Sequence, residues 1–222
     1  IKDIIKNKKF FNNLFKNFKN DFKRDFKKNN IDLLVGGPPC QGFSGIGIRR
    51  SYSVDKVQLP SNHLFQDMAY FIHKIKPKVF LFENVEGLLR SKWTKEGEKG
   101  EIFKDVLETF HNIPGYNVKY KLVHAKDYGV PQNRPRVLII GIKKQLLKDI
   151  TKNIDALEAS FLPTPEYDYP NLEEVFSDII DKKFVYGGET TIYPLDPQSE
   201  WQKNIRRSKS GRKIYKKGDS LS

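Results

Sequence analysis

Residues 31–44 have the sequence IDLLVGGPPCQGFS, in which a short apolar run is followed at once by two glycines and two prolines. The apolar run, residues 31–35, predicts a buried strand that ends at Gly36-Gly37. The glycines and prolines that follow favour a tight, non-repetitive backbone. The pattern therefore predicts a strand whose end presents Cys40 on a stiff loop.

Segments typical of strands and helices alternate along the chain after this stretch. Apolar residues at helical spacing predict two helices, and short apolar runs predict three further strands. In chain order these segments cover residues 64–75, 79–82, 102–110, 118–123 and 137–142. Such alternation favours an α/β fold with a mostly parallel sheet and helices on both faces.

Two side chains capable of chemistry follow the predicted strands. Cys40 follows the first strand after a short loop, and Glu83 follows the second strand directly. Active sites gather at the carboxyl ends of the strands in open sheets of this type. Gly42, Gly45 and Gly47 then give the next segment freedom to move. From the residues alone, Cys40 is either a nucleophile beside a mobile lid or a buried structural thiol.

Length and composition exclude several classes of protein. A chain of 222 residues with 38% hydrophobic content is long enough for one full α/β domain and part of another. It contains no apolar run long enough for a membrane span and no signal-peptide pattern. Its single cysteine cannot support a disulfide framework, so we expect a cytoplasmic bacterial protein.

The net charge of +13 is concentrated near the two ends of the sequence. Residues 1–30 carry ten Lys/Arg against three acids, and residues 203–217 carry eight Lys/Arg and no acid. This distribution suits a protein that meets a polyanion at defined places. Lysine-rich ends that are merely solvated remain an open alternative.

Three motifs, taken in order, resemble those of the C5-cytosine-specific DNA methyltransferase family. Residues 39–44 (PCQGFS) resemble its nucleophile motif, residues 83–85 (ENV) its Glu-Asn-Val motif, and residues 132–136 (QNRPR) its Gln-x-Arg-x-Arg motif. Each motif is weak alone, but the three in the same order and at similar spacing are highly specific. The resemblance covers roughly residues 15–145.

The resemblance implies roles for four residues. Cytosine C5 cannot take a methyl group from a sulfonium donor unaided, so Cys40 is expected to add to C6 as a thiolate. Glu83 is expected to protonate N3 or to donate a hydrogen bond to it. Arg136 is expected to bind O2, and Arg134 to support the nucleophile loop and the base from the same face of a strand start. The alternatives are a salt-bridged carboxylate for Glu83 and surface arginines for the other two.

The resemblance also implies contacts with DNA and with a methyl donor. Residues 44–62 resemble a mobile loop that closes over duplex DNA, from which the target cytosine flips out. The residues expected to contact DNA are Gln41, Ser44, Arg49 and Arg50. The implied donor is S-adenosyl-L-methionine, and no metal is expected. The residues expected to contact the donor are Asp21, Phe22, Pro38, Pro39 and Leu64.

Some motifs of the family are not found in the chain. Its glycine-rich cofactor loop and ribose-binding acid are expected before Ile1, and its final helix and most of its target-recognition domain after Ser222. We therefore expect residues 1–150 to form part of a Rossmann-like, S-adenosylmethionine-dependent catalytic domain. The proline-interrupted residues 151–222 are interpreted as a linker and the start of a smaller target-recognition domain.

Double-stranded DNA is the expected partner of a monomeric enzyme that does not associate with membranes. A separately acting restriction endonuclease is expected with it. One alternative is the tRNA-directed branch of the same family, whose Cys-Phe-Thr type signature is not found here. Another is a catalytically inactive DNA-binding homologue. A thiol hydrolase is disfavoured because no histidine lies in the three motifs to serve as a base for Cys40.

Overall fold

The computed structural model describes residues 31–39, 60–150 and 170–220, together with the single positions 13, 16 and 165. The chain separates into two compact units. The first contains residues 1–123 and 135–163, and the second contains residues 124–134 and 164–222. No helix in the described part of the chain is long and apolar enough to cross a membrane.

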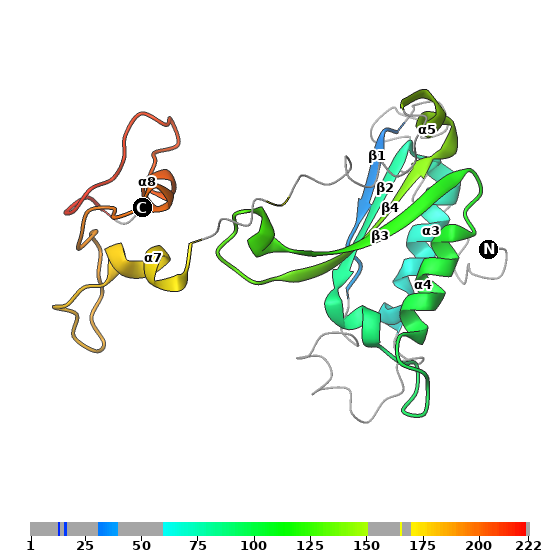
Figure 1. Ribbon diagram of the computed structural model, residues 1–222, viewed down its shortest axis with the longest axis horizontal. Helices are drawn as coiled ribbons and strands as arrows, with labels where there is room; N and C mark the ends of the chain where they lie inside the picture. Colours follow the sequence, from blue (N-terminus) through cyan, green and yellow to red (C-terminus); the bar gives the residue numbers. More distant parts are fainter. Residues whose placement is uncertain are drawn as a thin grey trace. The chain divides into compact units, whose positions relative to one another are not determined.

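A four-stranded sheet with the order β1-β2-β4-β3 forms the centre of the first unit (Figure 1). Strand β1 (Leu33–Gly36) pairs in parallel with β2 (Val79–Val85), and β2 pairs antiparallel with β4 (Pro135–Lys143). Strand β3 (Tyr116–His124) lies at the far side of β4. The sheet therefore has mixed strand directions.

Helices α3 (Leu64–Ile75) and α4 (Glu101–His111) cover one face of the sheet (Figure 1). Phe80 and Phe82 of β2 point into this layer and pack with buried residues of both helices, such as Ile72 and Phe110. An ideal Cβ on Gly141 would lie 2.0 Å from the Phe80 ring. Because Gly141 has no side chain, the Phe80 ring fits against β4 at this position.

The opposite face of the sheet has a smaller apolar cluster. Ile140 and Ile142 of β4 pack there with Leu147 of α5 (Lys144–Ile150). Two short 3-10 segments complete the described part of this unit, η3 (Pro60–His63) before α3 and η4 (Glu86–Arg90) after β2. Successive residues of β2 and β4 point to opposite faces, so these two strands contribute apolar side chains to both clusters.

The predicted helices and strands are present, but two details of the prediction were wrong. The sheet is not mostly parallel around β2, because β4 runs antiparallel to it. The segment between β3 and β4 spans only residues 125–134, which is too short for the helical crossover that parallel strands require. The first strand is also not fully buried. Its outward-facing Leu33 and Val35 are 53% and 58% exposed, since β1 is the edge of the described sheet.

The second unit has little regular structure. It contains η5 (Ala125–Tyr128), α7 (Leu172–Phe176), η6 (Ser177–Ile179) and α8 (Glu200–Ile205). Ser199 and Gln202 form a capping box at the start of α8, and the Gln202 amide also donates to the Glu174 carbonyl oxygen. The centre of this unit is thus polar rather than apolar.

Candidate active site

Glu83 and Arg136 face each other across the pairing of β2 with β4. The register places Val85 opposite Arg136 and Glu83 opposite Leu138, so the two charged side chains are diagonal neighbours on one face. Arg136 Nε lies 2.5 Å from Glu83 Oε1. Their side chains are 19% and 38% exposed, respectively, so the pair is partly open to solvent.

The loop that begins at the end of β1 runs beside this carboxylate. An ideal Cβ on Gly37 would lie 3.0 Å from Glu83 Oε2. Glu83 therefore directs one oxygen to Arg136 and places the other against the backbone of the loop. Any side chain larger than hydrogen at position 37 would press on the carboxylate.

Asn84 ties the same loop to β2. Its amide nitrogen donates to the Pro38 carbonyl oxygen at 3.4 Å, while its amide oxygen accepts from the Val85 backbone N–H at 2.9 Å. The residue is 4% exposed, so these contacts lie in the interior. Sequence reasoning assigned no role to Asn84. No local sequence signal pointed to this role, because the hydrogen bond joins residues that lie 46 positions apart.

Gly36 packs over the only methionine in the chain. An ideal Cβ at this position would lie 2.6 Å from Met68 Sδ on α3. Close approach of a backbone to a neighbouring side chain is a common reason for glycine in a strand. The two glycines thus let the end of β1 lie against α3 on one side and Glu83 on the other.

The structure describes only some of the predicted site residues. Pro38 is half-buried, Pro39 is exposed, and Leu64 is half-buried at the first position of α3. Seven predicted site residues lie outside the described ranges, namely Asp21, Phe22, Cys40, Gln41, Ser44, Arg49 and Arg50. The described part of the loop ends at Pro39, the residue before Cys40 in the sequence.

Arg134 lies immediately before β4 and is exposed. Its backbone is fixed by a turn: its N–H donates to the Gln132 carbonyl oxygen at 3.0 Å, and its own carbonyl oxygen accepts from Ala125 N–H at 3.1 Å. Asn133 Oδ1 lies 2.9 Å from His124 Nδ1 in the same turn. The proposed catalytic role of Arg134 stays a prediction.

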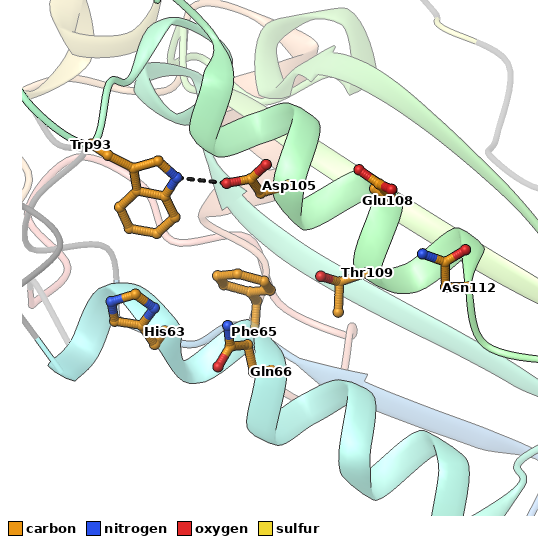
Figure 2. Close-up of a pocket in the computed structure, with 8 residues that line it drawn as sticks. All are labelled: His63, Phe65, Gln66, Trp93, Asp105, Glu108, Thr109 and Asn112. Atoms are coloured by element: carbon orange, nitrogen blue, oxygen red, sulfur yellow. Dashed lines mark hydrogen bonds between the residues drawn. The ribbon is translucent and has the colours of Figure 1, made fainter. Parts of the chain in front are cut away.

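A separate pocket of about 490 Å³ lies between α3 and α4 (Figure 2). The Trp93 indole N–H donates to Asp105 at 2.6 Å, and the Trp93 ring stacks on His63 with ring centroids 5.0 Å apart. Its lining contains none of the predicted catalytic or cofactor residues. These contacts attach the segment after η4 to α4, which is a structural role.

The sequence profile of the C-5 cytosine-specific DNA methylase family matches residues 4–220. The chain therefore belongs to this family of methyltransferases, as its three motifs predicted.

Two curated relatives show how far the similarity extends along the chain. The chain is 37% identical to the Type II methyltransferase M.DdeI of Desulfomicrobium norvegicum over 186 residues, which are 81% of this chain and 40% of that protein. It is 40% identical to the Type II methyltransferase M.XorII of Xanthomonas oryzae pv. oryzae over 121 residues, 54% of this chain and 26% of that protein. The chain thus spans less than half the length of these curated relatives.

One solved structure is similar in outline, an Escherichia coli prophage protein described as a DNA modification methyltransferase. The match covers 83% of this chain and 44% of that protein, with 24% sequence identity and a TM-score of 0.48.

Proposed function

We propose that this chain carries the reaction centre of a DNA (cytosine-5-)-methyltransferase, in which Cys40 attacks C6 of a cytosine flipped out of duplex DNA. The observation that carries the proposal is the Glu83–Arg136 pair, held at 2.5 Å beside the loop that leads into Cys40. A paired acid and guanidinium beside a loop that leads in the sequence to a cysteine match the three demands of this reaction.

The chemistry divides among these side chains. The Cys40 thiolate forms a bond to C6, and the displaced electron pair makes C5 nucleophilic. Negative charge builds up in the ring during this attack. Glu83 neutralises it by supplying a proton to N3. The methyl group leaves the sulfonium sulfur of its donor as it bonds to C5, and a base then removes the C5 proton. The C6–S bond breaks, Cys40 leaves as a thiolate, N3 returns its proton to Glu83, and the aromatic ring is restored.

The contacts of Glu83 and Arg136 support a choice of the atoms that are proposed to meet the base. Glu83 Oε1 is paired with Arg136 Nε, and Arg136 Nη1 donates to the Pro135 carbonyl oxygen at 2.7 Å. Glu83 Oε2 and Arg136 Nη2 have no such bond to a described residue, so they are the atoms proposed to face N3 and O2. A fixed guanidinium is suited to O2 because it stabilises charge without having to reorganise.

S-adenosyl-L-methionine, the donor that the family uses, supplies the methyl group as an electrophile. Pro39 is exposed and Leu64 is half-buried, so each has apolar surface that could contact one end of the donor. We assign Pro38, Pro39 and Leu64 to contacts with the donor, and Asp21 and Phe22 to its adenine end.

The DNA contacts of the proposal are Gln41 and Ser44 next to the nucleophile, and Arg49 and Arg50 for phosphates. Because the relatives are Type II methyltransferases by name, we assign the protein to a restriction-modification system with a separate endonuclease. Residues 1–150 are assigned to the catalytic domain. Residues 151–222 are assigned to a linker and the start of target recognition. The second unit supports this division through residues 164–222, although it also contains residues 124–134 of the assigned catalytic domain.

Trapping of the covalent intermediate tests the proposal. The whole protein should form a denaturation-resistant adduct with duplex DNA that carries 5-fluorocytosine, because fluorine at C5 blocks the elimination that releases Cys40. Cys40→Ser should form none, and Ser91→Cys, which adds a buried thiol elsewhere, should not restore it. An adduct that persists in Cys40→Ser would exclude Cys40. An adduct with tRNA but not with DNA would favour the tRNA-directed branch.

A further inference from the structure

The basic segment of residues 203–217 is not a uniform charged surface. Arg206, in its middle, is 2% exposed and forms an ion pair of 2.6 Å with Asp178. Its guanidinium also donates to the Leu195 carbonyl oxygen at 2.9 Å and lies 3.8 Å from the Tyr193 ring centroid. A buried cation with these partners organises the second unit and is closed to an external anion.

Two further cations of the segment are held by neighbouring acids. Lys203 Nζ lies 2.5 Å from Glu200, and Lys213 Nζ lies 3.1 Å from Asp219. The Arg207 guanidinium donates to the Gly211 carbonyl oxygen at 3.4 Å, four residues further along the chain. These side chains are exposed or half-buried, yet part of their charge is already compensated.

The remaining cations are Lys209, Arg212, Lys216 and Lys217. All four are exposed, and none forms an ion pair with an acid among the residues that the structure describes. Lys216 nevertheless lies in the same turn as Asp219 and helps to lower the pKa of that carboxyl. They lie on two consecutive tight turns, which we call the twin basic turns, residues 208–213 and 216–219.

The backbone of the twin basic turns is tied down. In the first turn, Ser208 N–H donates to the Lys213 carbonyl oxygen at 2.8 Å, and an antiparallel bridge pairs Arg207 with Ile214. In the second, Gly218 N–H donates to the Tyr193 carbonyl oxygen at 2.9 Å. Tyr215 N–H donates to the Arg206 carbonyl oxygen at 3.0 Å, which joins both turns to the buried cation.

We propose that the twin basic turns bind the sugar-phosphate backbone of duplex DNA through Lys209, Arg212, Lys216 and Lys217. Exposed cations on a fixed backbone suit phosphates because little conformational entropy is lost on binding. Buried Arg206 serves only to position the turns. This inference rests on the proposed DNA substrate and assigns one surface of the chain to it.

The salt dependence of DNA binding tests the inference. The whole protein is titrated into a labelled duplex at several salt concentrations, and the slope of log K against log salt is measured for each variant. Each lost phosphate contact should reduce the slope by about 0.9. Lys209→Gln with Arg212→Gln, and separately Lys216→Gln with Lys217→Gln, should therefore each reduce it by about 1.8.

Lys203→Gln with Lys213→Gln is the matched control, because it removes two charges from the same segment but from side chains that already have acid partners. Its slope should remain close to that of the parent chain. Equal reductions in all three double variants would overturn the inference, because net charge alone would then explain binding. Unchanged slopes in both turn variants would also overturn it.

The proposed function can fail separately from this inference. If the 5-fluorocytosine adduct is absent while the turn variants still lower the slope, the phosphate surface stands and the catalytic assignment falls. If the adduct forms but the turn variants have the same slope of log K against log salt as the parent chain, the catalytic assignment stands. The assignment of the twin basic turns to phosphate binding is then wrong.

Discussion

Glu83 and Arg136 are joined by an ion pair of 2.5 Å between two antiparallel strands, although the segment between them includes a helix and another strand. The chain also contains a second Glu–Arg pair in the same unit. Glu86 and Arg90 lie 3.2 Å apart in η4, and their side chains are 34% and 68% exposed. Glu83 also meets Gly37 in the loop after β1, whereas Glu86 and Arg90 pair with each other one helical turn apart, so the second pair serves as a control for the first.

Glu83→Gln should slow methyl transfer by about 10²–10⁴-fold, the range typical of general acid–base groups, because an amide cannot give a proton to N3. DNA affinity should stay nearly unchanged. Single-turnover transfer of labelled methyl groups by the whole protein measures the first quantity, and fluorescence anisotropy the second. Glu86→Gln makes the same chemical change and should transfer at the parent rate. Equal rates in both variants would remove Glu83 from the mechanism.

Arg136→Lys should lower the rate of methyl transfer by about 10²–10³-fold, the loss seen when one donor to a developing oxyanion is removed. Lysine keeps the charge but replaces the fixed planar donors of guanidinium with a mobile point charge. Arg90→Lys provides the control and should leave the rate unchanged. If lysine supports full activity at position 136, charge alone suffices and the geometric role assigned to the guanidinium is wrong.

Asn84→Asp should slow adduct formation with 5-fluorocytosine DNA. The substitution places a carboxylate oxygen against the Pro38 carbonyl oxygen, where the amide now donates a hydrogen bond. Because the site is buried, the free energy of unfolding should also fall, by roughly 1–3 kcal/mol.

A purely structural role for Asn84 predicts a different result. The loss of stability would then occur without any change in the rate of adduct formation at a temperature where both proteins are folded. Urea unfolding gives the first quantity and gel-resolved time courses the second. Asn112→Asp, at the exposed end of α4, should change neither by a comparable amount.

Tyr116→Phe should alter the stability of the chain in a way that depends on pH. Burial raises the pKa of Tyr116 from 10.0 to about 12, so the folded chain keeps this proton after the unfolded chain has released it. Stability from this group is therefore complete below pH 10 and is lost as pH rises towards 12. Near neutrality the variant should be less stable by about 0.5–1.5 kcal/mol, because the hydroxyl donates to the buried Pro77 carbonyl oxygen.

The stability difference between parent and variant should therefore narrow as pH rises above 10. Urea unfolding of both proteins at pH 8 and pH 11 measures it, and all other titrating groups cancel in the comparison. A difference that stays constant or widens with pH would contradict the assigned shift.

The site was predicted only in part from sequence. The motifs predicted roles for Cys40, Glu83 and Arg136. The structure brings Glu83 and Arg136 together, while Cys40 lies outside the described residues. The tether from Asn84 to Pro38 did not follow, since a hydrogen bond between segments far apart in the chain leaves no local pattern. The exposure of Leu33 and Val35 on β1 was missed for a related reason, because it depends on which strands lie beside β1.

The sequence by itself determined the helices and strands, because their apolar periodicity and their glycine and proline boundaries act over a few residues. It also determined the family, because three short motifs recur in order. Only the tertiary structure decided that β4 returns antiparallel to β2 and thereby brings Arg136 to Glu83. In the same way, only the packing decided that Arg206 is a buried positioning group while its basic neighbours are exposed. Pairing register and burial are set by contacts between distant segments, and these contacts are not encoded in any one stretch of the chain.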